Sequence, residues 1–341
     1  MNILFFGLGS IGQRHIRNIK KSWPDYNIYA YRQKNIVPLL NLKNNKVKGS
    51  VEKKYKIIST DYLDFFRKKK IQIDAAFICT PSSMHVNNAI WCIKKNIPVF
   101  IEKPVATNLK DLNKINKAIR NKKSLINVVG YQLRFNPIIK FIKNFCFENE
   151  KLGKIFSCEI YHGEHVDSFH SYESYKDSYT SKKKLGGGVS LTQIHEIDYL
   201  NFFLENYKFI DHEFMSEKIS KLEIDVEDIY TSIFKYQNKI NKKFILAKIT
   251  CSYLQIPKKR DIFISCEHGS IYADLNTMDI KIKKKNKKNI LKKFKINKNN
   301  IFIDEIKYFL NLVKKTKQTK KILPNIIDDR DVNKIAIKMK I

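Results

Sequence analysis

Residues 3–12 read ILFFGLGSIG, a short apolar run that leads directly into closely spaced glycines. Residues 3–6 are too few for a buried helix and are typical of a strand that is covered on both faces. After the glycines, apolar residues recur at helical spacing until about Trp23. A strand that turns through glycines into a helix predicts the beginning of a doubly wound parallel sheet with helices on both faces.

The glycines have the spacing G-x-G-x-x-G, which is the fingerprint of a dinucleotide-binding turn in this context. Gly7 would allow the tight turn, Gly9 would let the backbone approach a pyrophosphate, and Gly12 would let the helix pack closely on the strand. Ser10 and Ile11 complete the turn, where free N–H groups at the helix start would bind the pyrophosphate. A glycine-rich turn without a ligand is the alternative.

The end of the second predicted strand, residues 27–32, bears on the choice of cofactor. It reads Tyr31-Arg32-Gln33-Lys34 and has no carboxylate, whereas an NAD-preferring site usually has Asp or Glu there for the ribose 2′-hydroxyl. Arg32 can bind a 2′-phosphate and stack on the adenine. The sequence therefore favours NADP(H) over NAD(H), and a solvated strand end is the alternative for Arg32.

Two further predicted strands, 74–80 and 98–101, end in residues that would line the ligand crevice, because ligands bind at the carboxyl ends of the strands in such sheets. These candidate cofactor-site residues are Thr80, Pro81, His85, Glu102 and Lys103. A lysine at the mouth of a buried strand would be partly desolvated, so Lys103 could donate or accept a proton. A structural histidine at 85 and an ordinary surface lysine at 103 are the alternatives.

The motifs GLGSIG (7–12), TPSSMH (80–85), EKP (102–104) and GYQLRFNP (130–137) together resemble those of the Gfo/Idh/MocA family of NAD(P)-dependent oxidoreductases. The resemblance continues through LGKIFSCEIYHGEHV, LGGGVSLTQIHEIDYL and CEHGSIYADL, so it extends over nearly the whole chain. It implies that Lys103 of the EKP motif assists proton transfer and that Pro104 helps set the geometry of its loop.

The resemblance also implies two domains. Residues 1–130 would form the Rossmann dinucleotide-binding domain with its doubly wound parallel sheet. Residues 131–341 would form an α+β domain for substrate binding and oligomerisation, with an open, largely antiparallel mixed sheet whose face covers the nicotinamide. Period-two apolar patterning from about residue 225 onward independently predicts consecutive antiparallel strands. The domain to which the last predicted helix, 330–340, belongs is left open.

The segment 163–188 is aromatic, polar and too irregular for one helix. It resembles the corresponding segment of family members that act on sugars in surface-polysaccharide and nonulosonate pathways, where it contacts the substrate. Tyr175 and Tyr179 are therefore candidate substrate contacts, together with the neighbouring Lys176, and a plain surface is the alternative.

The glycines 186–188 open a predicted helix with Thr192, His195 and Asp198 spaced three apart, so that they share roughly one face. The resemblance implies that this helix faces the substrate and that His195 acts as an acid or base or polarises the reacting oxygen. The family usually has Asp where this chain has Thr192, and Thr cannot ionise, which argues against a carboxylate-supported proton relay. A buried structural histidine is the alternative for His195.

The chain of 341 residues carries a net charge of +32, from eight arginines and 57 lysines against 33 acidic residues. Lysines spread along a chain that is also rich in Ile and Asn favour compositional drift toward A+T-rich codons, with a polyanion-binding surface as the alternative. The six cysteines show no metal-ligand spacing, and no apolar run approaches the roughly 18 to 20 residues that cross a bilayer. We expect a soluble, cytoplasmic protein without a metal.

These observations lead to one main hypothesis. The chain is predicted to be an NAD(P)-dependent oxidoreductase that transfers a hydride between nicotinamide and a carbonyl or alcohol of a sugar or activated sugar, with Lys103 and His195 assisting proton transfer. A homo-dimer or homo-tetramer is expected, with no specific nucleic acid or membrane partner. A catalytically weak nucleotide-binding or regulatory homologue is the alternative, because of Thr192, and a polyanion-binding protein is the third reading.

Overall fold

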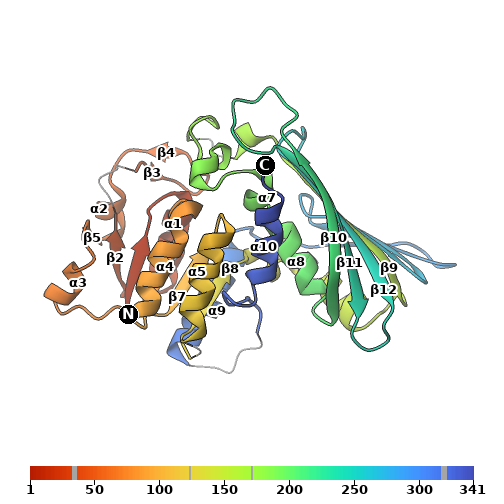
Figure 1. The fold of residues 1–341 in the computed structure, drawn as a ribbon, viewed down its shortest axis with the longest axis horizontal. Coiled ribbons are helices and arrows are strands. Elements are labelled where there is room, and N and C mark those ends of the chain that lie inside the picture. Colours follow the sequence, from red (N-terminus) through yellow and green to blue (C-terminus); the bar gives the residue numbers. More distant parts are fainter. Residues whose placement is uncertain (33–36, 123, 170–171, 316–320) are drawn as a thin grey trace.

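The computed structural model describes residues 1–32, 37–122, 124–169, 172–315 and 321–341. Two large sheets lie at opposite ends of the molecule, with helices between them (Figure 1). The chain builds the first sheet, crosses to the second, and returns to the first in its last helices. Among the described residues, no helix is both long and apolar enough to cross a membrane.

The first sheet has six parallel strands in the order β5-β2-β1-β6-β7-β8. The connections run outward in opposite directions from the neighbouring strands β1 and β6, which is the doubly wound arrangement with its switch point between these two strands. The strand bounds are β1 (Asn2–Phe6), β2 (Asn27–Tyr31), β5 (Ile57–Thr60), β6 (Ala75–Ile78), β7 (Val99–Glu102) and β8 (Asn127–Gly130).

The central strands of this sheet are fully buried, as their continuous apolar runs predicted. Phe5 stacks on Phe77 with 4.9 Å between ring centroids, and Phe77 stacks on Phe100 at 5.0 Å. These three rings link β1, β6 and β7 through one layer of the core, so the strands whose ends carry the predicted site are rigidly joined.

Helices cover both faces of the first sheet. They are α1 (Ser10–Ser22), α2 (Val51–Tyr55), α3 (Phe65–Lys68), α4 (His85–Lys94), α5 (Leu109–Arg120), α9 (Asn300–Lys314) and α10 (Arg330–Lys338). The helix α3 is short, because the chain leaves the helical conformation and Lys70 is left-handed at φ +53°. The Ser50 side chain caps the helix α2 by accepting from the Lys53 N–H.

The second sheet has eight strands in the order β10-β11-β12-β9-β13-β14-β15-β16. The strand β9 lies near its middle, parallel to β12 and antiparallel to β13, so the sheet is mixed and largely antiparallel, as predicted. The strand bounds are β9 (Ile155–Gly163), β10 (Tyr207–Glu217), β11 (Ile229–Asn238), β12 (Phe244–Ser252), β13 (Lys259–Cys266), β14 (Gly269–Asp274), β15 (Asp279–Lys284) and β16 (Ile290–Lys293).

One face of the second sheet packs on α7 (Val189–Thr192) and α8 (His195–Phe203), while no described helix covers the other face (Figure 1). The prediction of a single helix that carries Thr192, His195 and Asp198 is wrong, because this segment forms two helices. The chain leaves the helical conformation at Gln193, whose backbone lies at φ −101° and ψ 29°, and a new helix begins at His195. Thr192 and His195 consequently do not share one helix face.

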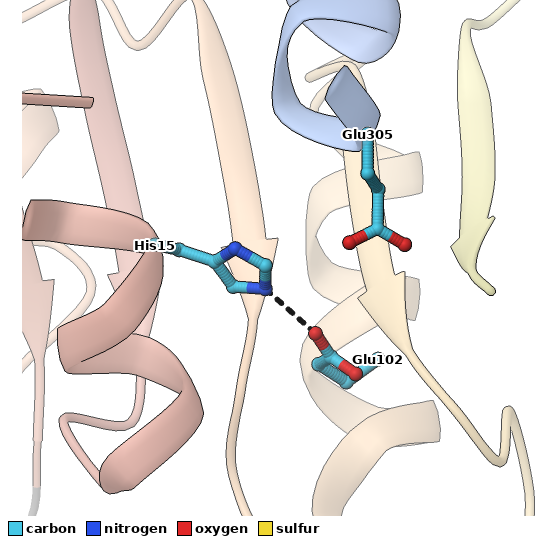
Figure 2. A group of neighbouring side chains, drawn as sticks. All are labelled: His15, Glu102 and Glu305. Carbon is cyan, nitrogen blue, oxygen red and sulfur yellow. Dashed lines mark hydrogen bonds and ion pairs between the residues drawn. The ribbon is translucent and has the colours of Figure 1, made fainter. Parts of the chain in front are cut away.

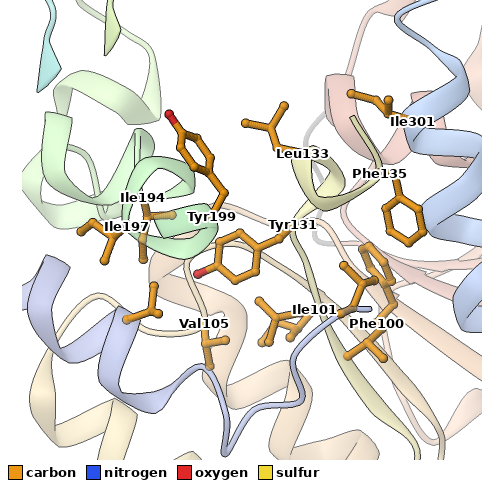
Figure 3. Packing of buried hydrophobic residues seen from close by; sticks show 14 of the residues in the cluster. Phe100, Ile101, Val105, Tyr131, Leu133, Phe135, Ile194, Ile197, Tyr199 and Ile301 are labelled. Atoms are coloured by element: carbon orange, nitrogen blue, oxygen red, sulfur yellow. The ribbon is translucent and has the colours of Figure 1, made fainter. Parts of the chain in front are cut away.

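Tyr131 connects the cores of the two halves (Figure 3). Its ring lies between Ile101 and Val105 on one side and Ile194 and Ile197 of the α8 region on the other, and all five side chains are buried. Its hydroxyl donates to Asp329 Oδ1 at 2.7 Å, which ties the junction to the C-terminal segment. The apolar core is thus continuous from the first sheet to the helices beneath the second.

The C-terminal segment completes the first sheet instead of extending the second. The Val129 N–H donates to Pro324 O at 2.9 Å, and Asn333 makes a pair of bonds with the backbone of Ala106, at 2.7 and 3.0 Å. The helix α9 packs on α1, and α10 packs on α5, α7 and α8. The last helix thus contacts both halves, and the division of the chain at residue 130 stays a prediction.

Candidate functional site

A pocket of about 720 Å³ opens at the carboxyl ends of β1, β2, β6 and β7. The segment 172–185 and the start of α8 form its opposite wall. The sequence-predicted residues that line it are Gly7, Gly9, Ser10, Ile11, Arg32, Thr80, Pro81, His85, Glu102, Lys103, Tyr179 and His195. Gly12, Tyr175 and Thr192 were predicted with them but do not line the pocket.

The geometry of the glycine turn fits a pyrophosphate. Gly7 is left-handed at φ +93°, and a Cβ at Gly12 would lie 2.5 Å from Gly7 O, so both positions require glycine. A Cβ at Gly9 would meet nothing within 4 Å, because this position faces the open pocket. No side chain caps the start of α1 and no acidic residue lies in its first turn, so its N–H groups can receive an anion.

Arg32 is paired in this structure. Its guanidinium binds the carboxylate of Glu52 on α2, which also accepts from the Ser50 hydroxyl at 2.8 Å. Burial opposes ionisation of Glu52, but hydrogen bonds from Ser50 and the backbone and the Arg32 charge lower its pKa. The Glu52 carboxylate therefore lies close to the end of β2. No local sequence pattern could have indicated this, because Glu52 is 20 positions along the chain from Arg32.

Lys103 crosses from the end of β7 to the other wall of the site. Its ammonium donates to Thr192 O at 2.7 Å. Burial lowers the pKa of Lys103 to about 8, with a further lowering by the charge of Arg260 and an opposing effect of Glu102 and Glu196. The side chain remains partly exposed to the pocket, so Lys103 can exchange a proton close to neutral pH.

His195 begins α8 and is 6% exposed. Burial lowers its pKa well below the ordinary value, and the charges of Lys103 and Arg260 act in the same direction. Its Nε2 lies 3.2 Å from the amide nitrogen of Gln132, a pocket residue that the sequence analysis did not single out although it belongs to the quoted GYQLRFNP motif. The ring is therefore neutral at physiological pH and serves as a hydrogen-bonding group.

Thr192 contributes to this site through its backbone. Its hydroxyl donates to Gly188 O at 2.9 Å or shares a proton with the Tyr253 hydroxyl at 2.5 Å, while its carbonyl accepts from Lys103. The side chain at the position of the family carboxylate therefore bonds to Gly188 and Tyr253, and Lys103 bonds to the Thr192 backbone.

A buried charge cluster beneath His195 was not predicted. Arg260 Nε of β13 donates to Glu196 Oε1 at 2.8 Å, while Arg260 Nη2 lies 2.6 Å and His162 Nδ1 of β9 lies 3.1 Å from the same oxygen. Burial opposes the charge on Glu196, but Arg260 and His162 lower its pKa below the ordinary range. Three elements of distant sequence meet here, and the only local hint was the position of Glu196 next to His195.

His85 and Asp198 have structural partners. The ring nitrogens of His85 each lie 2.8 Å from a backbone carbonyl oxygen, that of Pro104 and that of Thr80, so this side chain joins the loops after β6 and β7. Asp198 accepts from Arg134 through both carboxylate oxygens, at 2.6 to 3.1 Å. His85 thus shapes the pocket wall, while Asp198 lies in the protein behind it.

Three ionisable side chains meet directly behind the pocket (Figure 2). They are His15 on α1, Glu102 at the end of β7 and Glu305 on α9, which are 0%, 8% and 1% exposed. His15 Nε2 and Glu102 Oε1 are 2.7 Å apart, and one ligand-type atom from each of the three residues lies within 4.8 Å of the others. The chain segments that meet here are far apart in the sequence, so no spacing pattern predicted this group.

The irregular segment supplies both predicted and unpredicted residues to the pocket. The predicted Tyr179 lines it, and burial raises the pKa of this side chain. Tyr175 packs against the apolar core instead, and Lys176 pairs with Glu223 at the surface. The remaining lining residues of this segment are Tyr172, Glu173, Asp177 and Leu185.

The fold and the pocket define a dinucleotide-binding Rossmann protein with a second, mixed sheet. Residues 1–131 match a family described as an oxidoreductase family with an NAD-binding Rossmann fold, GFO_IDH_MocA. The part of the chain that builds the first sheet is therefore similar to the Gfo/Idh/MocA family, in agreement with the resemblance of its motifs.

Among curated proteins, the myo-inositol 2-dehydrogenase of Thermotoga maritima is 32% identical over 154 residues, which is 45% of this chain and 42% of the relative. The alignments with the first three curated relatives span 40 to 42% of those relatives' own length. Sequence similarity therefore covers less than half of them.

Solved structures share the fold over the whole chain. The UDP-N-acetylglucosamine 3-dehydrogenase of Acidithiobacillus ferrooxidans superposes with a TM-score of 0.73 at 14% identity, covering 99% of this chain and 96% of that one. A levoglucosan dehydrogenase in complex with NADH and L-sorbose superposes with a TM-score of 0.76 at 14% identity, covering 99% and 95%. Both sheets therefore belong to one known arrangement.

The glycine turn yields a matched pair of substitutions. Gly9→Ala should fold normally, because its Cβ enters open space, and should weaken NADPH or NADH binding by about tenfold or more because the methyl group occupies the place of the phosphates. Gly12→Ala should lower the free energy of unfolding by about 1–3 kcal/mol through overpacking. Urea unfolding and fluorescence titration measure both; equal effects of the two changes would contradict this assignment.

Proposed function

We propose that this protein is an NAD(P)-dependent oxidoreductase that transfers a hydride between nicotinamide and a carbonyl or alcohol carbon of a sugar or activated sugar. The observation that carries the proposal is Lys103, a lysine with a pKa of about 8 at the mouth of the dinucleotide pocket, beside a neutral His195. In this proposal residues 1–130 bind the dinucleotide, and residues 131–341 supply the substrate contacts and the oligomer interface.

The residues of this chain divide the chemistry between them. The bound nicotinamide supplies or accepts the hydride. The turn at Gly9 positions the phosphates, and Lys103 exchanges the proton of the substrate oxygen while its bond to Thr192 O keeps the ammonium in place. His195, being neutral, orients that oxygen by a hydrogen bond and needs no carboxylate partner at position 192.

The substrate class is supported by the lining and by the relatives. Tyrosine, glutamine and carboxylate groups face the pocket at Gln132, Glu173, Asp177 and Tyr179, and such groups suit a molecule rich in hydroxyls. The named relatives and structural neighbours include dehydrogenases of inositol, levoglucosan and UDP-N-acetylglucosamine.

For the cofactor we propose NADP(H), with Arg32 as the group that binds the 2′-phosphate. The ion pair between Arg32 and Glu52 weakens the preference for NADP(H) over NAD(H). A 2′-phosphate must displace the Glu52 carboxylate from Arg32, and the two negative groups then lie close together. Glu52 is therefore the residue that opposes NADP(H) binding in this site.

For the oligomer, the uncovered face of the second sheet is the proposed interface. Along β11 and β12 buried and exposed residues alternate, and the exposed set includes Ile233, Phe244 and Leu246, each about half exposed. A broad sheet face with apolar side chains on its solvent side suits a second copy of the chain.

A catalytically weak homologue is the second candidate, favoured by the Thr192 hydroxyl, which bonds to Gly188 O and Tyr253 and offers no carboxylate to Lys103. In that case the pocket would bind the dinucleotide, and no polyol or nucleotide sugar would be turned over.

The pH dependence of turnover tests the role of Lys103. In the oxidation direction Lys103 must be neutral to accept a proton, so the rate should rise as pH passes about 8; in the reduction direction it should fall over the same range. Lys103→Met should lower kcat by about 100-fold or more with the cofactor Kd nearly unchanged.

Lys103→Arg is the matched control, because it keeps the charge and the donor to Thr192 O but does not deprotonate near neutral pH. Measurements use a panel of polyols and nucleotide sugars with NADP+ or NADPH. Turnover that survives in both variants, or no turnover with the entire panel, would remove the proposed mechanism and favour the second candidate.

Fluorescence titration with NADPH and NADH tests the cofactor proposal. Arg32→Asp should weaken NADPH binding by about tenfold or more and affect NADH little, whereas Glu52→Gln should strengthen NADPH binding relative to NADH. A wild-type preference for NADH that persists in Glu52→Gln would refute the assignment of Arg32.

The oligomer proposal is tested by light scattering after size-exclusion chromatography. Leu246→Glu, which places a charge among the exposed apolar residues of β12, should shift the particle toward the monomer mass. Ile240→Glu is the control, since this residue is 88% exposed and lies in the turn between β11 and β12. A monomeric wild type would disprove the interface.

A further inference from the structure

Charged side chains are unevenly distributed over the face of the second sheet that no described helix covers (Figure 1). Strand alternation and register identify the residues of this face. At one edge, β10 contributes three acidic side chains and one lysine, namely Asp211, Glu213, Glu217 and Lys208. At the other edge, β15 and β16 contribute three lysines and one acidic side chain, namely Lys281, Lys283, Lys293 and Asp279. One edge of the face is thus acidic and the other is basic.

One row of side chains crosses this face almost from edge to edge. The strand register aligns residues of seven neighbouring strands, in the order Glu213, Ile233, Lys248, Glu159, Phe263, Tyr272 and Lys281. Each member of the row is exposed or half-buried, whereas alternate residues of the central strands, such as Ile160, Ala247 and Ile262, are buried on the other face. The row is acidic at β10 and basic at β15, and it has two neighbouring residues of opposite charge near its middle.

Two copies of this face can pack with aligned strands in two ways, which differ in the direction of the two-fold axis. If the axis runs across the strands, each edge of the sheet lies over the same edge of the partner, so β10 lies over β10. If the axis runs along the strands, the row is reversed, and the acidic edge of each copy lies over the basic half of the other. Both arrangements bury the same face, so the buried apolar area alone does not distinguish them.

The charges distinguish the two arrangements. An axis across the strands brings acidic side chains together at β10 and lysines together at β15 and β16, and like charges that face each other across an interface are strongly disfavoured. An axis along the strands brings opposite charges together. When that axis lies at the boundary between β12 and β9, Lys248 of each copy lies over the partner's Glu159, and Ile233 lies over the partner's Phe263. Ile233 and Phe263 are 51% and 38% exposed in the single chain, so this contact also covers apolar surface.

We propose that two copies of the chain pack face to face through the second sheet with the two-fold axis along the strands, near the boundary between β12 and β9, so that the acidic edge at β10 lies over the basic half of the partner's sheet. This orientation rests on the sheet interface of the proposed function and adds to it which strands meet. The charges act mainly on the specificity of the pairing, because they exclude the other aligned arrangement of the same two faces.

Cross-linking between engineered cysteines measures the orientation without changing a charge. The six native cysteines are buried, so the purified full-length protein can be treated with a short bis-maleimide and run on a denaturing gel. The variant that carries both Ile233→Cys and Phe263→Cys should be linked into a covalent dimer, because packed sheets lie about 10 Å apart. Ile233→Cys alone and Phe263→Cys alone are the matched controls. Neither should be linked, because the two copies of one residue are then three strand spacings apart, roughly 14 Å along the sheet.

A charge exchange measures whether the edges attract each other. Glu213→Lys should raise the dissociation constant of the dimer by about tenfold, and Lys281→Glu by a similar factor, because each change places like charges together. The variant that carries both changes should return to the wild-type value, because each new lysine then lies over the acidic side of the partner. Light scattering over a concentration series gives the dissociation constants, and circular dichroism shows that the variants are folded.

The other outcomes overturn the proposal. Linkage of Ile233→Cys alone would mean that β11 lies over β11, with the axis across the strands. A dimer in which neither the double variant nor the single variants are linked would mean that the sheets cross or that another surface forms the contact. A double charge variant that stays as weak as the single ones would remove the attraction between the edges. A monomeric wild type would remove the sheet interface of the proposed function itself, so that failure is distinguishable from a wrong orientation.

Discussion

The site depends on the close passage of the chain at the switch point between β1 and β6. Gly7 turns there with φ +93° directly beside the backbone of Cys79, where a Cβ would lie 2.6 Å from the Cys79 carbonyl oxygen. Because the two strands connect outward in opposite directions, no crossover covers their carboxyl ends, and the pocket opens between them. The helix α1 begins at the same point and brings both its free N–H groups and His15 into place.

The electrostatics of the pocket follow from which charges the fold buries together. Glu196 is fully buried with Arg260, so their charges largely balance beneath the site. His195 lies next to these charges and to Lys103, and it remains neutral because burial and both cations disfavour its protonation. Lys103 is the group left near its titration point, which gives the pocket one residue suited to proton exchange at neutral pH.

Local patterns were sufficient for the first half of the chain. The buried strands, the glycine turn and the helix that follows it were predicted, because each depends on contacts close in the sequence. Errors occurred where a local pattern was ambiguous or a distant segment decided the outcome. The helix predicted through His195 is interrupted at Gln193, and Tyr175, read as a substrate contact, packs against the core instead of lining the pocket.

The amino-acid sequence by itself determined the Rossmann start and the resemblance to a family, because periodicity and short motifs encode local geometry, and that resemblance singled out Lys103 and His195 as candidate catalytic residues. Only the tertiary structure decided that Lys103 bonds to a backbone carbonyl of Thr192, that Arg32 pairs with Glu52, and that β9 lies in the middle of the second sheet. The same holds for His15, Glu102 and Glu305, which are brought together from three elements. The physical reason is that ion pairs, hydrogen bonds and burial involve groups that are distant along the chain. The free energies of these interactions set the charge state of each residue in the site.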